Sequence, residues 1–447
     1  MNKACAQKSQ SAADTLGERN LHAQLRQGGS HNDFFRVSEG LVQFFSLKIA
    51  RLLGLAFFLL GLPSFAAGPV TWGEQALVNT VSTFADGGRD ARGILPGHFG
   101  SQYGRMTKLA DGSWLMVYTI YDNAGYKNGD AHDLSWQGTA LQVARSTDRC
   151  RTWNVIATLR GDNRDLDNGE IIQLPNGQLR MACRSVRWQQ SYLISVWSSV
   201  DGGVTWRWLS QPDGNEGFPG SLGNPDKGVY EPDFCLLDDG TLALFYSSEK
   251  HVTEYPSYSQ IISEKTSADW GQTWGLETWV AWDSDRPSDR PGMPVITKMA
   301  NGKYLVVFEV VGSRNADVFC KISSDGKTWN RGVGTVIPGQ IGGPYVASLA
   351  DGRLVVISNT GNVSFSRNFG AVWYLNNPPA WGNGTTKTYW WLSVYQTGPE
   401  EIGAVASVPR PSGGTDVQIK FGTLSKEAQW MDASAVQNLC LRCTFPY

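Results

Sequence analysis

The chain has 447 residues and a formal net charge of −2, so no excess of basic residues marks it as a nucleic-acid-binding protein. Charged residues make up only 18% of it, whereas it holds 50 glycines and 18 tryptophans, which favours a turn-rich all-β protein that stacks aromatic rings on sugars. The alternative is that the tryptophans fill a β core. The seven cysteines and five histidines show no zinc spacing and no cluster, so we predict no catalytic metal and no cofactor.

The N-terminal segments carry an export pattern. Residues 1–40 are polar and without periodicity, and we predict that they are disordered or precede the true start of translation. Within residues 41–67, Lys48 and Arg51 precede an apolar block over residues 52–62, and small residues up to Ala66 and Ala67 follow it as the cleavage region, which is the order of a secretory signal peptide. The block is short for a membrane span, although a signal anchor is the alternative. We therefore expect a protein secreted to the extracellular space or the periplasm.

From Arg105 onward, one hairpin pattern recurs: a strand, an Asp-Gly or Asn-Gly turn and a second strand. The five hairpins span residues 106–118, 170–183, 233–246, 295–308 and 345–357. Repetition at a near-constant spacing indicates a repeat architecture, and four strands in each repeat predict the blades of a β-propeller.

The second half of each repeat carries Ser-x-Asp-x-Gly-x-Thr-Trp, complete at residues 199–206 and 267–274 and modified at 146–153, 323–329 and 366–373. Its Asp accepts hydrogen bonds from the backbone N–H groups that follow, its Gly allows a positive φ and its Trp covers the turn. This motif is similar to the Asp-box, or BNR repeat, of the sialidase-like β-propellers. The resemblance implies that these motifs are structural and lie away from the active face.

Further strands follow the fifth hairpin. Residues 387–394 and 401–408 predict a sixth blade, and residues 416–422 and 69–82 are the candidates for outer strands that close the ring from both ends of the chain. We therefore predict an all-β fold, a six-bladed β-propeller over residues 68–424. A tail over residues 425–447 follows, in which the spacing of Cys440 and Cys443 favours a disulfide over a metal or redox site.

Counting from each turn places the open ends of the hairpins on the face opposite the Asp-boxes. This face is rich in carboxylates, arginines and aromatic residues, whereas a plain scaffold would place apolar residues near its axis. The side chains predicted to bind substrate there are Tyr103, Arg105, Asn168, Glu170, Arg184, Asp233, Glu249, Met293, Tyr345 and Trp390.

Two glutamates on this face suggest glycoside hydrolysis. Glu309 interrupts an apolar strand, so partial desolvation should raise its pKa, although a strand-end Glu that points to water is the alternative. Glu231 has polar neighbours that should keep it ionised. Carboxyls with separated pKa values are what this chemistry needs, one to protonate the leaving oxygen and one to attack the anomeric carbon or activate water. Glu170 is a rival that we rank as substrate-binding.

Longer phrases resemble glycoside hydrolase family 93. They are Tyr230-Glu-Pro-Asp-Phe, Phe245-Tyr-Ser-Ser-Glu249, Arg290-Pro-Gly-Met-Pro-Val-Ile-Thr, Gly302-Lys-Tyr-Leu-Val-Val-Phe-Glu309 and Gly342-Gly-Pro-Tyr345. The resemblance implies a retaining exo-α-1,5-L-arabinanase that releases arabinobiose from linear arabinan. Its catalytic glutamates fall on Glu231 and Glu309. Their surroundings assign Glu231 as the nucleophile and Glu309 as the acid/base, and the reverse assignment stays open. Tyr230 and Asp233 depart from the family pattern, which leaves the glycan open.

Two other functions fit parts of the sequence. Arg105 within Tyr103-Gly-Arg-Met is similar to the start of a sialidase, but Met293 and Tyr345 stand where that family needs further arginines. A non-catalytic carbohydrate-binding propeller would need no pair of glutamates with separated pKa values. We expect a polysaccharide or oligosaccharide, plant cell-wall arabinan above all, as the partner of a monomer.

Overall fold

The computed structural model describes residues 69–81, 100–121, 139–187, 189–222, 227–386, 389–411 and 414–425. The chain divides into Met1–Ser64 and Phe65–Tyr447, and every described residue lies in the second unit. The predicted N-terminal extension, signal peptide and C-terminal disulfide lie outside the described residues. Within those residues, no helix is long and apolar enough to cross a membrane.

The protein is all-β, as predicted, and four of its sheets contain four antiparallel strands each. The first sheet contains β6 (Asp165–Gln173), β7 (Leu179–Arg187), β8 (Ser191–Ser199) and β9 (Arg207–Glu216). The second contains β10 (Val229–Leu236), β11 (Leu242–Ser248), β12 (Ile261–Ser267) and β13 (Thr278–Ala281), with the 3-10 helix η2 (Lys250–Thr253) between β11 and β12. The third contains β14 (Arg290–Lys298), β15 (Tyr304–Val311), β16 (Asp317–Ser323) and β17 (Thr335–Ile341). The fourth contains β18 (Tyr345–Ser348), β19 (Leu354–Ile357), β20 (Val363–Ser366) and β21 (Tyr374–Leu375).

The remaining eight strands form a single sheet with two halves. One half contains β2 (Gly100–Lys108), β3 (Trp114–Tyr121), β4 (Thr139–Ser146) and β5 (Asn154–Leu159), and the other contains β22 (Trp390–Gly398), β23 (Glu401–Pro409), β24 (Thr415–Leu424) and β1 (Val70–Asn79). A single parallel pair, Gly100 with Thr415, joins the halves. The N-terminal β1 pairs antiparallel with the C-terminal β24, as predicted for the strands from the two chain ends.

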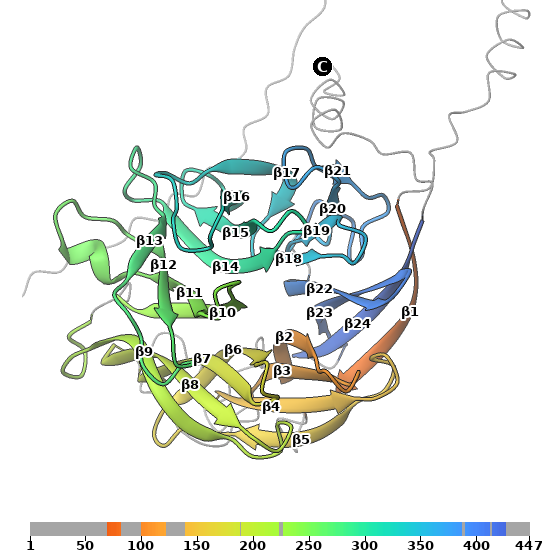
Figure 1. Ribbon diagram of the computed structural model, residues 1–447, viewed down its shortest axis with the longest axis horizontal. Helices are drawn as coiled ribbons and strands as arrows, with labels where there is room; N and C mark the ends of the chain where they lie inside the picture. Colours follow the sequence, from red (N-terminus) through yellow and green to blue (C-terminus); the bar gives the residue numbers. More distant parts are fainter. Residues whose placement is uncertain are drawn as a thin grey trace, which may run out of the picture. The chain divides into compact units, whose positions relative to one another are not determined.

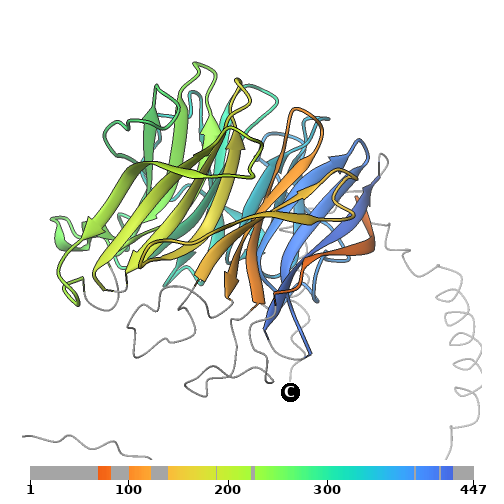
Figure 2. The ribbon, with the colours of Figure 1, turned by 90° about the horizontal axis from the view of Figure 1, so that it is seen from below.

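The first strands of these groups contact one another in chain order. β2 contacts β6, β6 contacts β10, β10 contacts β14, β14 contacts β18, β18 contacts β22, and β22 contacts β2. Figure 1 shows these strands around a common centre, with β5, β9, β13 and β17 farther out. Figure 2 shows the long strands running side by side between two ends.

All five predicted hairpins are present, as the pairs β2–β3, β6–β7, β10–β11, β14–β15 and β18–β19. The glycine of each turn has a φ between 81° and 86°, a region that glycine enters without a Cβ clash. The second strands are buried along nearly their whole length, and every residue of β3 is buried. Neighbouring sheets cover both faces of these strands, so the strands show no apolar–polar alternation.

The Ser-x-Asp motifs form the local turns that the sequence predicts. In the motif around Asp201, the Thr205 backbone N–H and hydroxyl donate to the carboxylate, at 2.9 Å and 2.6 Å. The Ser199 hydroxyl also donates to it, at 2.8 Å, and Trp206 Nε1 donates to the Gly203 carbonyl at 2.9 Å. The hydrogen bonds from Thr and Ser recur around Asp148 and Asp269. Trp153 Nε1 donates to the Cys150 carbonyl, whereas Trp274 Nε1 donates to Ser210 Oγ.

These turns should make the fold sensitive to acid. The hydrogen bonds from Thr205 and Ser199 lower the pKa of Asp201 to about 2. Because the folded-state pKa is below the unfolded value of about 3.9, this contribution is complete above pH 4 and disappears as the pH falls toward 2. We expect Asp201→Asn to reduce the loss of stability over that range, measured by urea unfolding. Asp162→Asn, at an exposed position, is the control and should follow the wild-type curve.

Candidate functional site

A β-bulge interrupts five of the six first strands near their N-terminal ends. The pairing register shifts at Gln102/Arg105, Asp167/Glu170, Tyr230/Asp233, Gly292/Val295 and Trp390/Ser393. Each bulge holds a residue with positive φ, and we call these the bulge residues: Tyr103 (56°), Asn168 (50°), Glu231 (57°), Met293 (54°) and Trp391 (50°). Gly343 (45°) takes the same place before β18. Positive φ is costly for most of these residue types, and such strain concentrates at functional sites.

The backbone N–H of most bulge residues donates to a side chain on the second strand of the preceding group or just after that strand. Met293 donates to Ser247 Oγ (3.1 Å), Gly343 to Glu309 Oε2 (2.7 Å), Trp391 to Asn359 Oδ1 (2.8 Å) and Tyr103 to Ser407 Oγ (3.3 Å). A buried N–H needs such an acceptor. Glu309 is half-buried on β15 and takes the place that Ser or Asn takes in other sheets. Its carboxylate therefore has a structural role, as the acceptor for the Gly343 N–H, that the sequence did not reveal.

Glu231 is the bulge residue of β10, and its carboxylate is held from two sides. Its Oε2 accepts hydrogen bonds from Ser247 Oγ and from the Met293 backbone N–H, each at 2.9 Å. Burial of the carboxyl raises the pKa of Glu231, while these hydrogen bonds and the charges of Arg184 and Arg290 oppose the rise. The sequence predicts no such rise in the pKa of Glu231. The polar residues next to Glu231 in the sequence do not show that the fold places it near the centre.

A second layer of side chains lies two residues farther along each first strand. Three predicted site residues meet there: Arg105 on β2, Glu170 on β6 and Asp233 on β10, all buried. Burial and the Asp233 charge raise the pKa of Glu170 well above its usual value, although Arg105 opposes the rise. Asp233 Oδ2 accepts from the Ile296 N–H at 2.7 Å. This layer combines two carboxyls with one guanidinium group.

Aromatic rings enclose the Arg105 guanidinium. Its Cζ lies 3.9 Å from the centre of the Tyr103 ring and 5.2 Å from that of Tyr345, both predicted site residues. Its Nη1 donates to the carbonyls of Gly104 and Trp391. The Tyr345 ring lies 4.9 Å from that of Tyr395, which the sequence did not single out because it stands in an ordinary apolar strand pattern.

The other predicted site residues lie around this centre. Glu249 is buried and accepts hydrogen bonds from Tyr230 Oη (2.9 Å), the Gly228 N–H (3.3 Å) and Arg290 Nη2. Arg290 was not predicted as a site residue, since a strand-end arginine carries no special signal.

Arg184 and Trp390 complete the set. Arg184 Nη1 lies 3.9 Å from Asp167 Oδ2, and Trp390 is 41% exposed, with its ring centre 6.1 Å from that of Trp391. The Trp391 ring in turn lies 6.4 Å from that of Tyr103. Within the described part of the chain, no group of three or more His, Cys, Asp or Glu side chains could hold a metal ion.

No family model and no curated protein matches the sequence. Its fold is similar to that of solved structures. The Penicillium chrysogenum α-L-arabinanase complexed with arabinobiose has a TM-score of 0.61 and 20% identity, covering 81% of this chain and 99% of its own. The Fusarium graminearum α-L-arabinofuranosidase bound to an iminosugar inhibitor has a TM-score of 0.63 and 20% identity, with coverage of 80% and 99%. A Dyadobacter fermentans protein of unknown function has a TM-score of 0.55 and 13% identity, with coverage of 80% and 100%. The chain therefore shares a fold with these proteins.

Proposed function

We propose that residues 68–424 form a six-bladed β-propeller. The support is the contact order of the six first strands and the pairing of β1 with β24, which gives the last group its fourth strand. A strand from the N-terminus that completes a blade built from the C-terminus holds the two chain ends together. In this arrangement, the bulge residues line one end of the central axis.

We infer that the protein is a glycoside hydrolase acting on α-1,5-linked L-arabinan, from which it releases arabinobiose. The observation that carries this proposal is a pair of glutamates on the contacting strands β6 and β10: Glu170, which is buried, and Glu231, which is half-buried. The fold shared with an arabinanase and an arabinofuranosidase, and the family phrases around Tyr230 and Glu309, support the choice of arabinan.

Glu231 is the nucleophile in this proposal. One carboxylate oxygen attacks the anomeric carbon while the bond from that carbon to the leaving oxygen breaks. The hydrogen bonds from Ser247 and Met293, together with the charges of Arg184 and Arg290, favour the ionised form that attack requires. Water then attacks the same carbon, which releases the sugar and restores the Glu231 carboxylate.

The proton donor is Glu170. It gives its proton to the leaving oxygen in the first step and recovers one from the attacking water in the second. Burial and the Asp233 charge favour its protonated form. Glu309, the donor predicted from the sequence, is the rival candidate, but its carboxylate accepts a backbone hydrogen bond, which favours the ionised form.

The charges around the axis favour a neutral sugar over sialic acid. Arg290 is paired with Glu249, and Arg184 lies near Asp167. Carboxyl groups outnumber guanidinium groups among the residues described above, which are Asp167, Glu170, Glu231, Asp233, Glu249 and Glu309 against Arg105, Arg184 and Arg290. A substrate carboxylate would meet repulsion from this set. We also propose that the protein is exported and acts as a monomer.

The function is tested by incubating the purified protein with debranched arabinan and, separately, with a sialyl oligosaccharide. We expect arabinobiose from the first and no free sialic acid from the second. Release of sialic acid would establish the sialidase alternative. Binding of arabinan without any product would establish a non-catalytic carbohydrate-binding protein.

A Glu309→Gln variant separates the two candidate proton donors. The amide oxygen still accepts from the Gly343 N–H, so we expect kcat on arabinan to stay within about tenfold of wild type. Glu309→Leu removes the acceptor of this buried N–H and should lower the free energy of unfolding by about 1–3 kcal/mol. A loss of about 10²-fold or more in Glu309→Gln, within the range of general acid catalysis, would instead identify Glu309 as the donor.

A further inference from the structure

The second layer of the central axis is asymmetric. Its six members are each two residues beyond a bulge residue or Gly343, and all are at most 8% exposed. Three neighbouring strands contribute charged side chains and the other three do not: Arg105, Glu170 and Asp233 against Val295, Tyr345 and Ser393. Charged groups are therefore confined to one half of an otherwise uncharged layer, directly along the chain from Tyr103, Asn168 and Glu231.

The charges in this half balance only if the two carboxyls share one proton. With Arg105 protonated and both acids ionised, the buried cluster would carry a net negative charge, which is costly away from water. One proton makes the cluster neutral: a guanidinium, one carboxylate and one carboxylic acid. Two buried acids that interact in this way lose their protons in separate steps.

The surroundings decide which acid keeps the proton. Asp233 Oδ2 accepts from the Ile296 backbone N–H at 2.7 Å, which stabilises its carboxylate. Burial raises the pKa of both acids, and the Asp233 charge adds to the rise at Glu170. The ionisable groups that interact with Glu170 are Tyr103 and Arg105 from β2, Asp233 from β10, Tyr345 from β18 and Tyr395 from β22. Among the described residues that interact with Glu170, Asp233 is the one acid.

We propose that Asp233 is a positioning residue whose carboxylate keeps the proton on Glu170 through the neutral pH range. It acts through Glu170 and does not touch the sugar, in place of the substrate-binding role predicted from the sequence. The inference rests on the proposed function in so far as Glu170 is the proton donor. It explains why an acid stands in a layer that apolar side chains would fill at no electrostatic cost.

The test is Asp233→Asn, which removes the charge but keeps an oxygen that accepts from the Ile296 N–H. Without the neighbouring anion, Glu170 loses its proton at lower pH. We therefore expect the basic limb of kcat/KM on arabinan to move at least about one unit toward acid, equivalent to a tenfold loss on that limb. At a pH below the basic limbs of both proteins, the rate of the variant should stay within a few-fold of wild type. Asp285→Asn, at an exposed position, is the matched control and should leave the profile unchanged.

Arg105→Gln is a second variant, in which the basic limb should move in the opposite direction. Loss of the cation removes an interaction that favours ionised Glu170, so the basic limb should move toward higher pH. A merely structural role for either residue would lower the rate without moving the limb. An unmoved basic limb in a folded Asp233→Asn protein overturns the proposal, and if that variant does not fold, an unmoved limb in Arg105→Gln does so.

A measurement without substrate separates this proposal from the function. The carboxyl carbon of Glu170, labelled with ¹³C and assigned with Glu170→Gln, is titrated by NMR in the ligand-free protein. A midpoint that falls in Asp233→Asn supports the proposal even if wild type releases nothing from arabinan, in which case only the proposed function fails. An equal midpoint in the two proteins overturns the proposal whatever the activity.

Discussion

Glu231→Gln should abolish turnover of arabinan while leaving the fold intact. Gln has the same shape, and its amide oxygen still accepts the hydrogen bonds from Ser247 and Met293, so the bulge of β10 keeps its geometry. An amide cannot form the glycosyl ester through which the proposed reaction proceeds. We expect kcat to fall by about 10⁴-fold or more, the scale seen when a central catalytic group is removed. The measurement is the release of arabinobiose, with unfolding in urea as the check on stability.

Activated substrates separate the nucleophile from the proton donor. In an aryl arabinoside with an acidic phenol, the phenolate leaves without being protonated. Glu170→Gln should therefore still release it in a first rapid step. Glu231→Gln should be inactive on the same substrate, because attack on the anomeric carbon is missing. Glu216→Gln, an exposed substitution, is the control and should match wild type. Substantial turnover of the aryl substrate by Glu231→Gln would exclude Glu231 as the nucleophile.

The hairpins and their turns could be predicted because their signals are local. An Asp-Gly or Asn-Gly pair between two apolar runs favours a tight turn wherever it occurs, and the structure has strand pairs at all five positions. The pairing of β1 with β24 was also predictable, because a repeat of four strands leaves the last group one strand short, and a strand from the other end of the repeats can complete it. These features depend on neighbours in the sequence or on the repeat itself.

The bulges could not be predicted from residue types. Only Asn168 and Gly343 among the six positions favour a positive φ, whereas Tyr103, Met293 and Trp391 do not. Their conformation is held by acceptors from another part of the chain, such as Asn359 for Trp391. The same long-range contact explains Glu309: in the sequence it is an isolated acid in an apolar strand, and in the fold it caps the backbone of the next sheet.

The roles of the acids depend on a layer that forms only in the folded chain. Glu170 and Asp233 are far apart in the sequence, and each alone has the pattern of a polar residue at a strand end. Burial beside each other changes their proton affinities, so Glu170 rather than Glu309 becomes the better candidate for proton donor. The residue types are visible in the sequence, whereas the contacts that set their protonation states form only in the folded chain.

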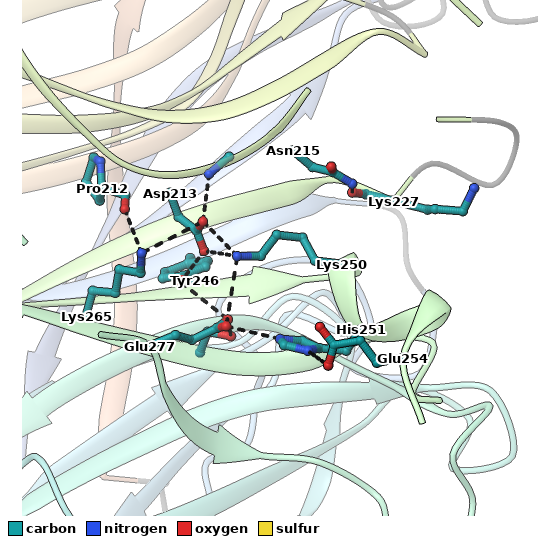
Figure 3. A network of polar contacts seen from close by, with 12 residues as sticks. Pro212, Asp213, Asn215, Lys227, Tyr246, Lys250, His251, Glu254, Lys265 and Glu277 are labelled. Carbon is teal, nitrogen blue, oxygen red and sulfur yellow. Dashed lines mark hydrogen bonds and ion pairs between the residues drawn. The ribbon is translucent and has the colours of Figure 1, made fainter. Parts of the chain in front are cut away.

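A polar network joins two neighbouring sheets (Figure 3). Asp213 on β9 accepts from Tyr246 Oη on β11 at 2.5 Å and from Lys250 Nζ, at the start of η2, at 2.6 Å. Lys265 Nζ lies 3.9 Å from the same carboxylate and donates to the Pro212 carbonyl at 2.9 Å. The side chain of Asp213 is 7% exposed, so its charge and those of the two lysines are mutually compensated away from bulk water.

Asp213→Ala should therefore be among the most destabilising single substitutions in the chain. It leaves Lys250 and Lys265 without their shared carboxylate, and Glu277, whose Oε2 is 3.9 Å from Lys250 Nζ, compensates only one of them. Removing one partner of a buried ion pair costs about 3–5 kcal/mol of unfolding free energy. Urea unfolding measures the loss. Asp111→Ala breaks the more exposed pair with Arg145 and should cost far less.

A double-mutant cycle then assigns the loss to the network rather than to packing. Lys250→Met removes the cation while keeping most of the apolar stem, so the Asp213→Ala substitution should cost less in that background than in wild type. The difference between the two costs is the coupling energy, and contacting charged groups give about 0.5–3 kcal/mol. Equal costs in the two backgrounds would mean that the Asp213–Lys250 contact contributes nothing. The loss in Asp213→Ala would then lie with Tyr246 and Lys265, which the corresponding cycles with Tyr246→Phe and Lys265→Met would measure.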